Sequence, residues 1–202
     1  MASQNLQASG SPPRLRAVLN IAHRGAAGEA PENTLAAFEL ARRQGADAVE
    51  FDVHLSADGV PVVIHDERLE RTTSGTGLVA EHAVTALKRL DAGSWFNRQH
   101  PAKARGAYAR QRIPLLSEAL AWVRARNCLA YLELKAGSRV YPGIEGIVLD
   151  EIHRAGVSAL ITVMSFDFAA VRRVRELDGE IRLGTSFQRP GLAMRRAKLV
   201  AA

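Results

Sequence analysis

Residues 48–66 read AVEFDVHLSADGVPVVIHD, two apolar segments that each end in titratable side chains. The segments 48–53 and 60–64 are rich in Val and Ile, which favour β-strands, and Asp58-Gly59 between them is a turn signal. The connection between the two strands is too short for a crossover helix. In an antiparallel hairpin Asp52 faces His65, and in a parallel pair both residues end at the same mouth, so either arrangement brings them to one site.

Outward from this stretch, short apolar segments alternate with segments of helical length, which is typical of parallel βαβ units. We expect Asn33 to cap the first helix. The pattern predicts an α/β fold of the (β/α)8 TIM-barrel type that is incomplete, with about six of the eight strands. An insertion at 67–113, after the third strand, interrupts it. The predicted strands are 18–22, 48–53, 60–64, 129–134, 160–164 and 181–183, and the predicted helices are 34–44, 117–126, 144–155 and 168–177.

The composition suits one globular domain and excludes several classes of protein. The chain has 202 residues, 47% of them apolar, and we expect a folded region at 17–202 after a flexible leader at 1–16. Cys128 is the single cysteine, and with no secretory signal in view we expect a cytoplasmic protein. No apolar segment approaches the ~18–20 residues that cross a bilayer, so we expect no membrane insertion.

The net charge of +6 does not by itself indicate a nucleic-acid partner. All but four of the 27 basic residues are Arg, they are scattered along the chain, and no aromatic side chains interleave with them as a stacking platform requires. We therefore expect no nucleic acid among the partners.

Acidic side chains end two of the interior strands. Glu50 and Asp52 share one face of the second strand, because successive side chains of a strand point to opposite faces. Glu133 ends the fourth strand, just before Lys135. Carboxylates gathered in an apolar setting repel one another unless a cation lies between them, and oxygen ligands suit Mg²⁺ or Ca²⁺. The sequence predicts one such divalent cation at Glu50, Asp52 and Glu133, although a strand end salt-bridged to Lys135 explains Glu133 taken singly.

Two histidines follow predicted strands at the end where barrels of this type carry their active sites. His23 lies in His23-Arg24-Gly25 after the first strand, and His65 follows the third. Imidazoles can act as general acid and base near neutral pH, and Arg24 and Lys135 suit a phosphate group. The set fits cleavage of a phosphodiester, with the order of the two histidines left open. The remaining histidines are interpreted as structural or exposed: His54, His82, His100 and His153.

The residues above lie in a series of motif segments that runs from about Ile21 to Phe187. In this order the segments resemble glycerophosphodiester phosphodiesterases of the bacterial, cytoplasmic type. The segments are His23-Arg24-Gly25, Pro31-Glu32-Asn33-Thr34, Glu50-Phe51-Asp52, Asp58-Gly59-Val60-Pro61-Val62-Val63-Ile64-His65-Asp66, Arg71-Thr72-Thr73-Ser74-Gly75-Thr76-Gly77, Asp91-Ala92-Gly93-Ser94-Trp95-Phe96, Ile113-Pro114-Leu115-Leu116-Ser117-Glu118-Ala119-Leu120, Leu132-Glu133-Leu134-Lys135 and Ser165-Phe166-Asp167.

The resemblance implies that residues 17–202 hydrolyse small glycerophosphodiesters, such as glycerophosphocholine, to sn-glycerol 3-phosphate and an alcohol. It also implies the same roles for the candidate residues. The acid/base pair is His23 and His65, the phosphate-binding residues are Arg24 and Lys135, and the Mg²⁺ or Ca²⁺ ligands are Glu50, Asp52 and Glu133.

The sequence after Phe187 departs from the family pattern, and we expect the last two strands to be missing, as in a truncated or frameshifted chain. Open strand edges would then favour oligomerisation. Two alternatives to the enzyme remain: a catalytically impaired member that acts at most as a phosphate- and metal-binding module, and a related lipid phosphodiesterase, which needs an apolar or interfacial entrance.

Overall fold

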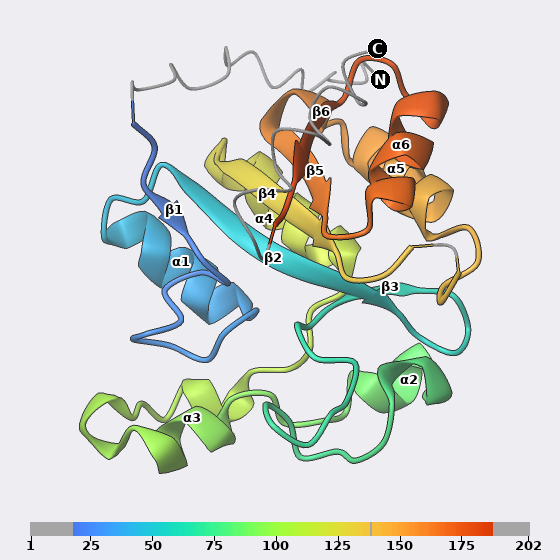
Figure 1. Ribbon diagram of the computed structural model, residues 1–202. Helices are drawn as coiled ribbons and strands as arrows, with labels where there is room; N and C mark the ends of the chain where they lie inside the picture. Colours follow the sequence, from blue (N-terminus) through green and yellow to red (C-terminus); the bar gives the residue numbers. More distant parts are fainter. Residues whose placement is uncertain (1–17, 138, 188–202) are drawn as a thin grey trace, which may run out of the picture.

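A computed structural model describes residues 18–137 and 139–187, whose backbone forms one six-stranded sheet with helices packed against it (Figure 1). Five strands run parallel in the order β1-β2-β4-β5-β6. Among the described residues β1 and β6 each pair on one side only, so the parallel path is open. The α/β fold of incomplete barrel type is confirmed, and the predicted leader at 1–16 lies outside the described residues. The parallel strands are β1 (Ile21–Ala22), β2 (Ala48–Leu55), β4 (Leu129–Leu134), β5 (Ile161–Ser165) and β6 (Arg182–Thr185).

The sixth strand, β3 (Pro61–Val63), pairs antiparallel with β2 through a tight turn, so the hairpin is the correct alternative. Gly59 takes a φ of +76°, and its N–H donates to the carbonyl of Ser56 at 3.0 Å. Pairing with β3 extends β2 to Leu55, two residues past the predicted end. The first strand is shorter than predicted, because Val18 at its expected start is 82% exposed and the ladder begins only at Ile21.

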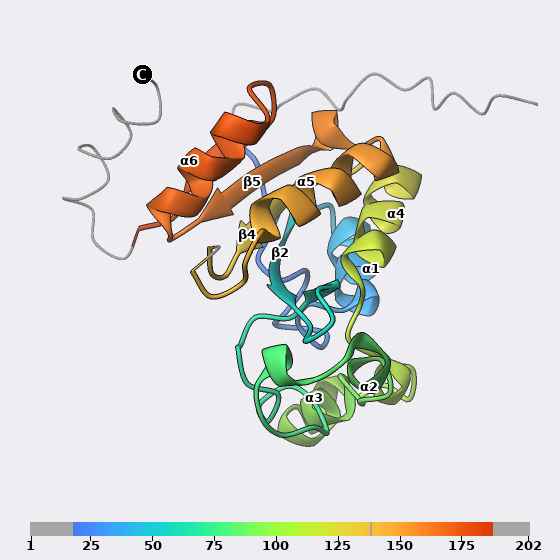
Figure 2. The same cartoon turned by 90° about the vertical axis from the view of Figure 1, so that its right-hand side faces the viewer.

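Four helices connect the parallel strands and pack on the sheet (Figure 2). Thr34, and not Asn33 as predicted, caps the first of them, since its hydroxyl accepts the backbone N–H of Ala37 at 3.2 Å. A single 3-10 turn, η4 (Ser158–Leu160), precedes β5. Among the described residues, no helix is both long and apolar enough for a membrane span. The helices are α1 (Leu35–Arg43), α4 (Leu116–Arg126), α5 (Ile144–Ala155) and α6 (Phe168–Leu177).

The core lies between these helices and the sheet, and β2 is buried along its whole length. Phe51 of β2 packs against Phe38 of α1 with 5.5 Å between ring centroids, and Leu132 of the neighbouring β4 is fully buried. Because one face of β2 is committed to this apolar layer, its alternate side chains point to the other face of the sheet, where the polar residues gather.

The insertion between β3 and α4 forms a separate lobe, seen below the sheet in Figures 1 and 2. Two apolar clusters join it to the rest of the fold: the one around Leu87 includes Val62 of β3, and the one around Phe96 includes Ala37 of α1. Gly93 is required where the lobe closes on itself, since a Cβ there would lie 1.8 Å from the carbonyl oxygen of Tyr108. Its elements are η1 (Val79–Glu81), α2 (Val84–Leu87), α3 (Ser94–Gln99), η2 (Pro101–Lys103) and η3 (Tyr108–Arg110).

Candidate active site

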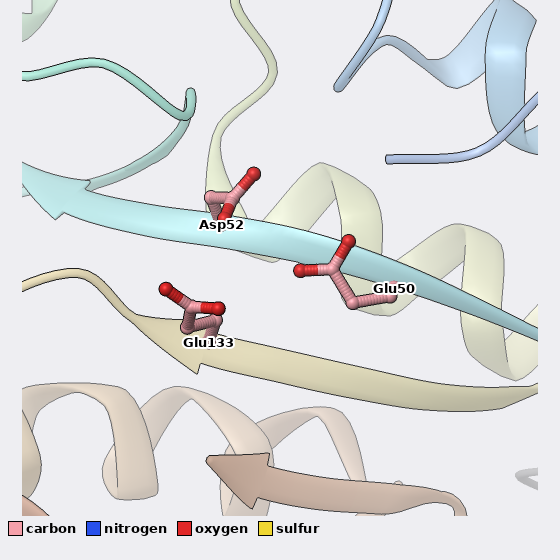
Figure 3. Close-up of side chains that lie close together, drawn as sticks. All are labelled: Glu50, Asp52 and Glu133. Atoms are coloured by element: carbon pink, nitrogen blue, oxygen red, sulfur yellow. The ribbon is translucent and has the colours of Figure 1, made fainter. Parts of the chain in front are cut away.

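Three buried carboxylates point toward one another near the carboxyl ends of β2 and β4 (Figure 3). Asp52 lies opposite Glu133 in the parallel register, and Glu50 precedes Asp52 by two residues on the same face of β2. The three side chains are at most 6% exposed, and one oxygen from each lies within 4.8 Å of the others. The structure thus brings together the side chains that the sequence assigned to a cation.

Two basic side chains border these carboxylates. Nζ of Lys135 donates to Glu133 at 2.7 Å and lies 3.2 Å from Oδ1 of Asp52. Nε of Arg24 lies 3.5 Å from Oδ2 of Asp52, and the Arg24 backbone N–H donates to Glu50 at 2.9 Å. Both residues therefore reach the carboxylates, as expected of groups that would share a phosphate with a cation.

The backbone conformation after β1 makes the Arg24 contacts possible. Arg24 has a φ of 57°, and Gly25 follows with a φ of +75°. A Cβ on Gly25 would lie 2.7 Å from the backbone of Ala37 in α1, so only glycine allows this turn to pack on the helix. The glycine of the His23-Arg24-Gly25 motif therefore acts through the backbone, by placing Arg24.

The carboxylates carry more negative charge than their neighbours neutralise. Burial raises the pKa of Glu50 to about 8, and the charges of Asp52 and Glu133 add to the effect. Oδ1 of Asp52 is buried and, within the described part of the chain, makes no well-formed hydrogen bond, although Nζ of Lys135 lies 3.2 Å away as an ion pair. A divalent cation fits these observations, because it supplies positive charge among three oxygen donors and a ligand site for the Asp52 oxygen that lacks a well-formed hydrogen bond.

Asn33 is a site residue that sequence reasoning missed. Its side-chain amide donates to Oδ2 of Asp52 at 2.7 Å, and its carbonyl oxygen accepts the Asp52 backbone N–H at 3.3 Å. Asn33 has a φ of 56°, a left-handed conformation that Asn tolerates better than most residues. The amide thus orients the carboxylate of Asp52, and the segment Pro31-Glu32-Asn33-Thr34 was the one available signal.

His23 lies at the open edge of the site. Its Nε2 is 3.9 Å from Oε2 of Glu50, and its side chain is 71% exposed. Partial desolvation is the first cause that lowers the pKa of His23, and the positive charges of Arg24 and His65 act in the same direction. His23 is therefore disposed to be neutral, and able to take up a proton, near neutral pH.

His65 is oriented by an ion-pair network that includes the insertion. Its Nδ1 lies 2.5 Å from Oδ1 of Asp66, and Arg71 donates two hydrogen bonds to Asp66. Arg71 also donates two hydrogen bonds to Glu32, which accepts a further one from Arg24 at 2.9 Å. His65 is therefore joined through this network to the phosphate-binding candidate Arg24.

The charges within the network hold it in its ionised form. Hydrogen bonds from Arg71 keep the pKa of Asp66 well below its usual range. Burial alone would raise the pKa of Glu32, but the hydrogen bonds and charges of Arg71 and Arg24 together outweigh it and lower that pKa. Sequence reasoning did not single out Glu32, Asp66 or Arg71, because their roles depend on a contact between two loops 39 residues apart.

The four other histidines lie as interpreted. His54 is buried and hydrogen-bonded through both ring nitrogens, and His82 is bonded to the carbonyl of Thr76. His100 and His153 are exposed. All seven candidate residues from the sequence belong to, or are linked by the network to, one cluster at the strand ends.

Comparison with known proteins agrees with this geometry. Residues 23–202 match the glycerophosphoryl diester phosphodiesterase family. A glycerophosphodiester phosphodiesterase of Caldanaerobacter subterraneus is 37% identical over 170 residues, which are 84% of this chain and 67% of that protein. Its Bacillus subtilis counterpart is 42% identical over 128 residues, which are 63% and 43% of the two chains.

Solved structures share the fold. A phosphodiesterase of Oleispira antarctica, in complex with the product sn-glycerol-3-phosphate, superposes with a TM-score of 0.80 at 35% identity, covering 90% of this chain and 71% of that one. A glycerophosphodiester phosphodiesterase of Agrobacterium tumefaciens gives a TM-score of 0.70 at 36% identity, covering 81% and 64%.

This chain spans about two thirds or less of the length of the curated relatives named here. Within that span the family match extends from His23 onward, and it therefore includes every candidate site residue. On these grounds the chain belongs to the glycerophosphoryl diester phosphodiesterase family.

Proposed function

We propose that this chain hydrolyses glycerophosphodiesters to sn-glycerol 3-phosphate and an alcohol, with one divalent cation, Mg²⁺ or Ca²⁺, held by Glu50, Asp52 and Glu133. The observation that carries the proposal is the cluster of three buried carboxylates, with one oxygen of each within 4.8 Å of the others and only Asp52 and Glu133 paired with Lys135 among the described residues. The product complex of the Oleispira antarctica relative supports the substrate class.

The phosphate would lie over the carboxylate cluster. The cation, when bound, would polarise the phosphoryl oxygens and neutralise charge that develops as the ester bond breaks. Arg24 and Lys135 would supply the remaining positive charge, Arg24 as a planar donor and Lys135 as a compact one. Both are tethered to carboxylates by the ion pairs described above, so little reorganisation is needed when the substrate binds.

His23 and His65 would move the protons. One would accept a proton from the attacking nucleophile, and the other would donate a proton to the departing alcohol. Asp66 holds Nδ1 of His65 and leaves Nε2 as the nitrogen available for proton transfer. The exposed position of His23 suits the open side of the site, where an alcohol can leave. The assignment of acid and base between the two stays open.

Release of glycerol 3-phosphate from glycerophosphocholine tests the proposal. We expect release with Mg²⁺ or Ca²⁺, none after treatment with EDTA, and a large loss in Glu133→Gln. Glu176→Gln is the matched control, because Glu176 is an exposed glutamate of α6 that pairs with Arg172 and Arg173 on the same helix. Full activity in EDTA, or in Glu133→Gln, would contradict the proposal.

A second substrate arm separates the two enzyme classes considered from the sequence. Micellar lysophospholipid, supplied at the same phosphodiester concentration, should be cleaved far more slowly than glycerophosphocholine. The reverse preference would favour a lipid phosphodiesterase. A cytoplasmic location and assembly through the open strand edges stay predictions, which cell fractionation and light scattering would test.

A further inference from the structure

His54 is a buried histidine that does not belong to the proposed acid/base pair but contacts His65, which does. His54 is on β2, two residues beyond Asp52, and is 4% exposed. Its Nε2 lies 2.9 Å from the backbone carbonyl oxygen of His65, and its Nδ1 lies 2.8 Å from the hydroxyl of Tyr141. Both ring nitrogens therefore have partners, and one of these partners is the main chain of a candidate catalytic residue.

The partners determine the direction of each hydrogen bond. A carbonyl oxygen can only accept, so Nε2 of His54 must carry the proton that bonds the His65 carbonyl. In a neutral ring Nδ1 then has only a lone pair, and the hydroxyl of Tyr141 must donate to it. Burial raises the pKa of Tyr141 to about 12, so its hydroxyl keeps this proton. The chain of bonds runs in one direction, from Tyr141 through His54 to His65.

The main chain of His65 needs this additional hydrogen bond because it lies beyond the last hydrogen bond of the sheet. β3 ends at Val63, and the last hydrogen bond to β2 is from the Ile64 N–H to the Asp52 carbonyl at 3.0 Å. His65 follows this bond, and its side chain is held at the other end by Asp66. The His54 bond fixes the main chain from which the imidazole extends, and the Asp66 bond fixes the ring.

Tyr141 connects a second loop to His54. It lies in the connection between β4 and α5, is 5% exposed, and packs edge-on against His54 with 5.6 Å between ring centroids. This connection begins with Lys135, which contacts the carboxylates. The loop that carries a phosphate-binding candidate thus also fixes the loop that carries the acid/base candidate.

We propose that His54 and Tyr141 are positioning residues for the imidazole of His65: His54 hydrogen-bonds the main chain of His65, and Tyr141 hydrogen-bonds and orients His54. Neither side chain has the exposure needed to touch a substrate, so both act through His65. The inference rests on the proposed role of His65 in proton transfer.

Tyr141→Phe is the sharpest test, because it removes one hydroxyl and leaves the ring in place. We expect kcat to fall by about 10- to 100-fold, the scale of a small misplacement of a catalytic group, with the KM for glycerophosphocholine and the affinity for the cation little changed. Tyr108→Phe is the matched control. Tyr108, in the insertion, is also buried, at 4% exposure, and its hydroxyl also donates one hydrogen bond, to the carbonyl of Glu29 at 3.0 Å in the loop before α1.

A double-mutant cycle separates positioning from general destabilisation. In a His65→Ala background, Tyr141→Phe should have no further effect on residual turnover, since the group it places is gone. His54→Gln, which keeps an N–H donor, should recover most of the kcat that His54→Ala loses. An equal loss from Tyr108→Phe, or a further loss in the His65→Ala background, would overturn the inference.

Nuclear magnetic resonance of ¹⁵N-labelled histidine side chains tests the geometry without using activity. We expect His54 to be neutral with its proton on Nε2, and the His65 ring signals to shift in Tyr141→Phe while those of His153 stay fixed. A His54 proton on Nδ1, or unchanged His65 signals, would overturn the inference. If the wild-type chain released no glycerol 3-phosphate but these signals behaved as expected, the proposed function would fail while the placement of His65 would stand.

Discussion

Removing the divalent cation should make the stability of this protein depend strongly on pH, through Glu50. Burial and the neighbouring carboxylates raise the pKa of Glu50 from 4.5 to about 8 in the folded chain. Between these two values the folded state binds a proton that the unfolded state does not. The free energy of unfolding of the cation-free protein therefore falls as pH rises through this window, and the contribution of Glu50 is fully present only below about pH 4.5.

The size of the effect follows from the width of the window. A rise in pKa from 4.5 to about 8, at ~1.36 kcal/mol per pH unit, corresponds to roughly 5 kcal/mol. That is comparable to the whole stability of many domains, about 5–15 kcal/mol. A bound cation takes the place of the proton, so the stabilisation it gives should grow with pH.

Urea unfolding at pH 5, 6, 7 and 8, in EDTA and in saturating Mg²⁺ or Ca²⁺, measures this dependence. Trp95 and Trp122 serve as fluorescence probes. In EDTA the wild-type chain should lose most of its stability between pH 5 and 8, and Glu50→Gln should not. Glu176→Gln, the exposed control, should follow the wild type. A cation-free wild type whose pH dependence matches that of Glu50→Gln would refute the reasoning.

Three further substitutions test individual contacts. Asn33→Gly keeps the left-handed backbone but removes both hydrogen bonds to Asp52. Cation affinity, measured by calorimetric titration, should therefore weaken by about 10- to 100-fold. Unchanged affinity would exclude this orienting role. Arg71→Ala removes the donors that hold Asp66 and Glu32. The kcat should therefore fall by about tenfold while the circular dichroism spectrum is unchanged. A kcat equal to wild type would show that the network does not place His65. Leu132→Ala empties a fully buried position between β2 and β5, so urea unfolding should show a loss of about 2–5 kcal/mol; a loss under 1 kcal/mol would mean that the core collapses around the gap.

The alternation of side chains along the predicted strands was sufficient to predict the part of the site that lies on β2 and β4. Alternation put Glu50 and Asp52 on one face of β2, and the parallel register brought Glu133 opposite Asp52. The same rule would also have put His54 on that face. We interpreted His54 only as structural or exposed because the predicted strand ended at Val53, whereas pairing with β3 extends β2 to Leu55. Because of this two-residue error at the strand end, the proposed positioning role of His54 was missed.

The loop-borne part of the site could not be predicted in this way. Asn33 carries a residue type and position that favour a helix cap, and only the contact with Asp52 reveals that it serves the carboxylate. Arg71 lies in the insertion and meets Glu32 across 39 residues of sequence. Such partners are set by how loops pack in three dimensions, which strand and helix periodicity does not encode.

Glu50, Asp52 and Glu133 are proposed to hold a divalent cation between β2 and β4, and the position of that ion can be observed directly. Crystals grown with Mn²⁺ as a substitute for Mg²⁺ would locate the ion by its anomalous scattering. The account predicts a single strong peak among these three carboxylates, with Oδ1 of Asp52 among the ligands, and loss of that peak in Glu133→Gln. A well-ordered cluster of the three carboxylates with no peak between them, at saturating Mn²⁺, would contradict it.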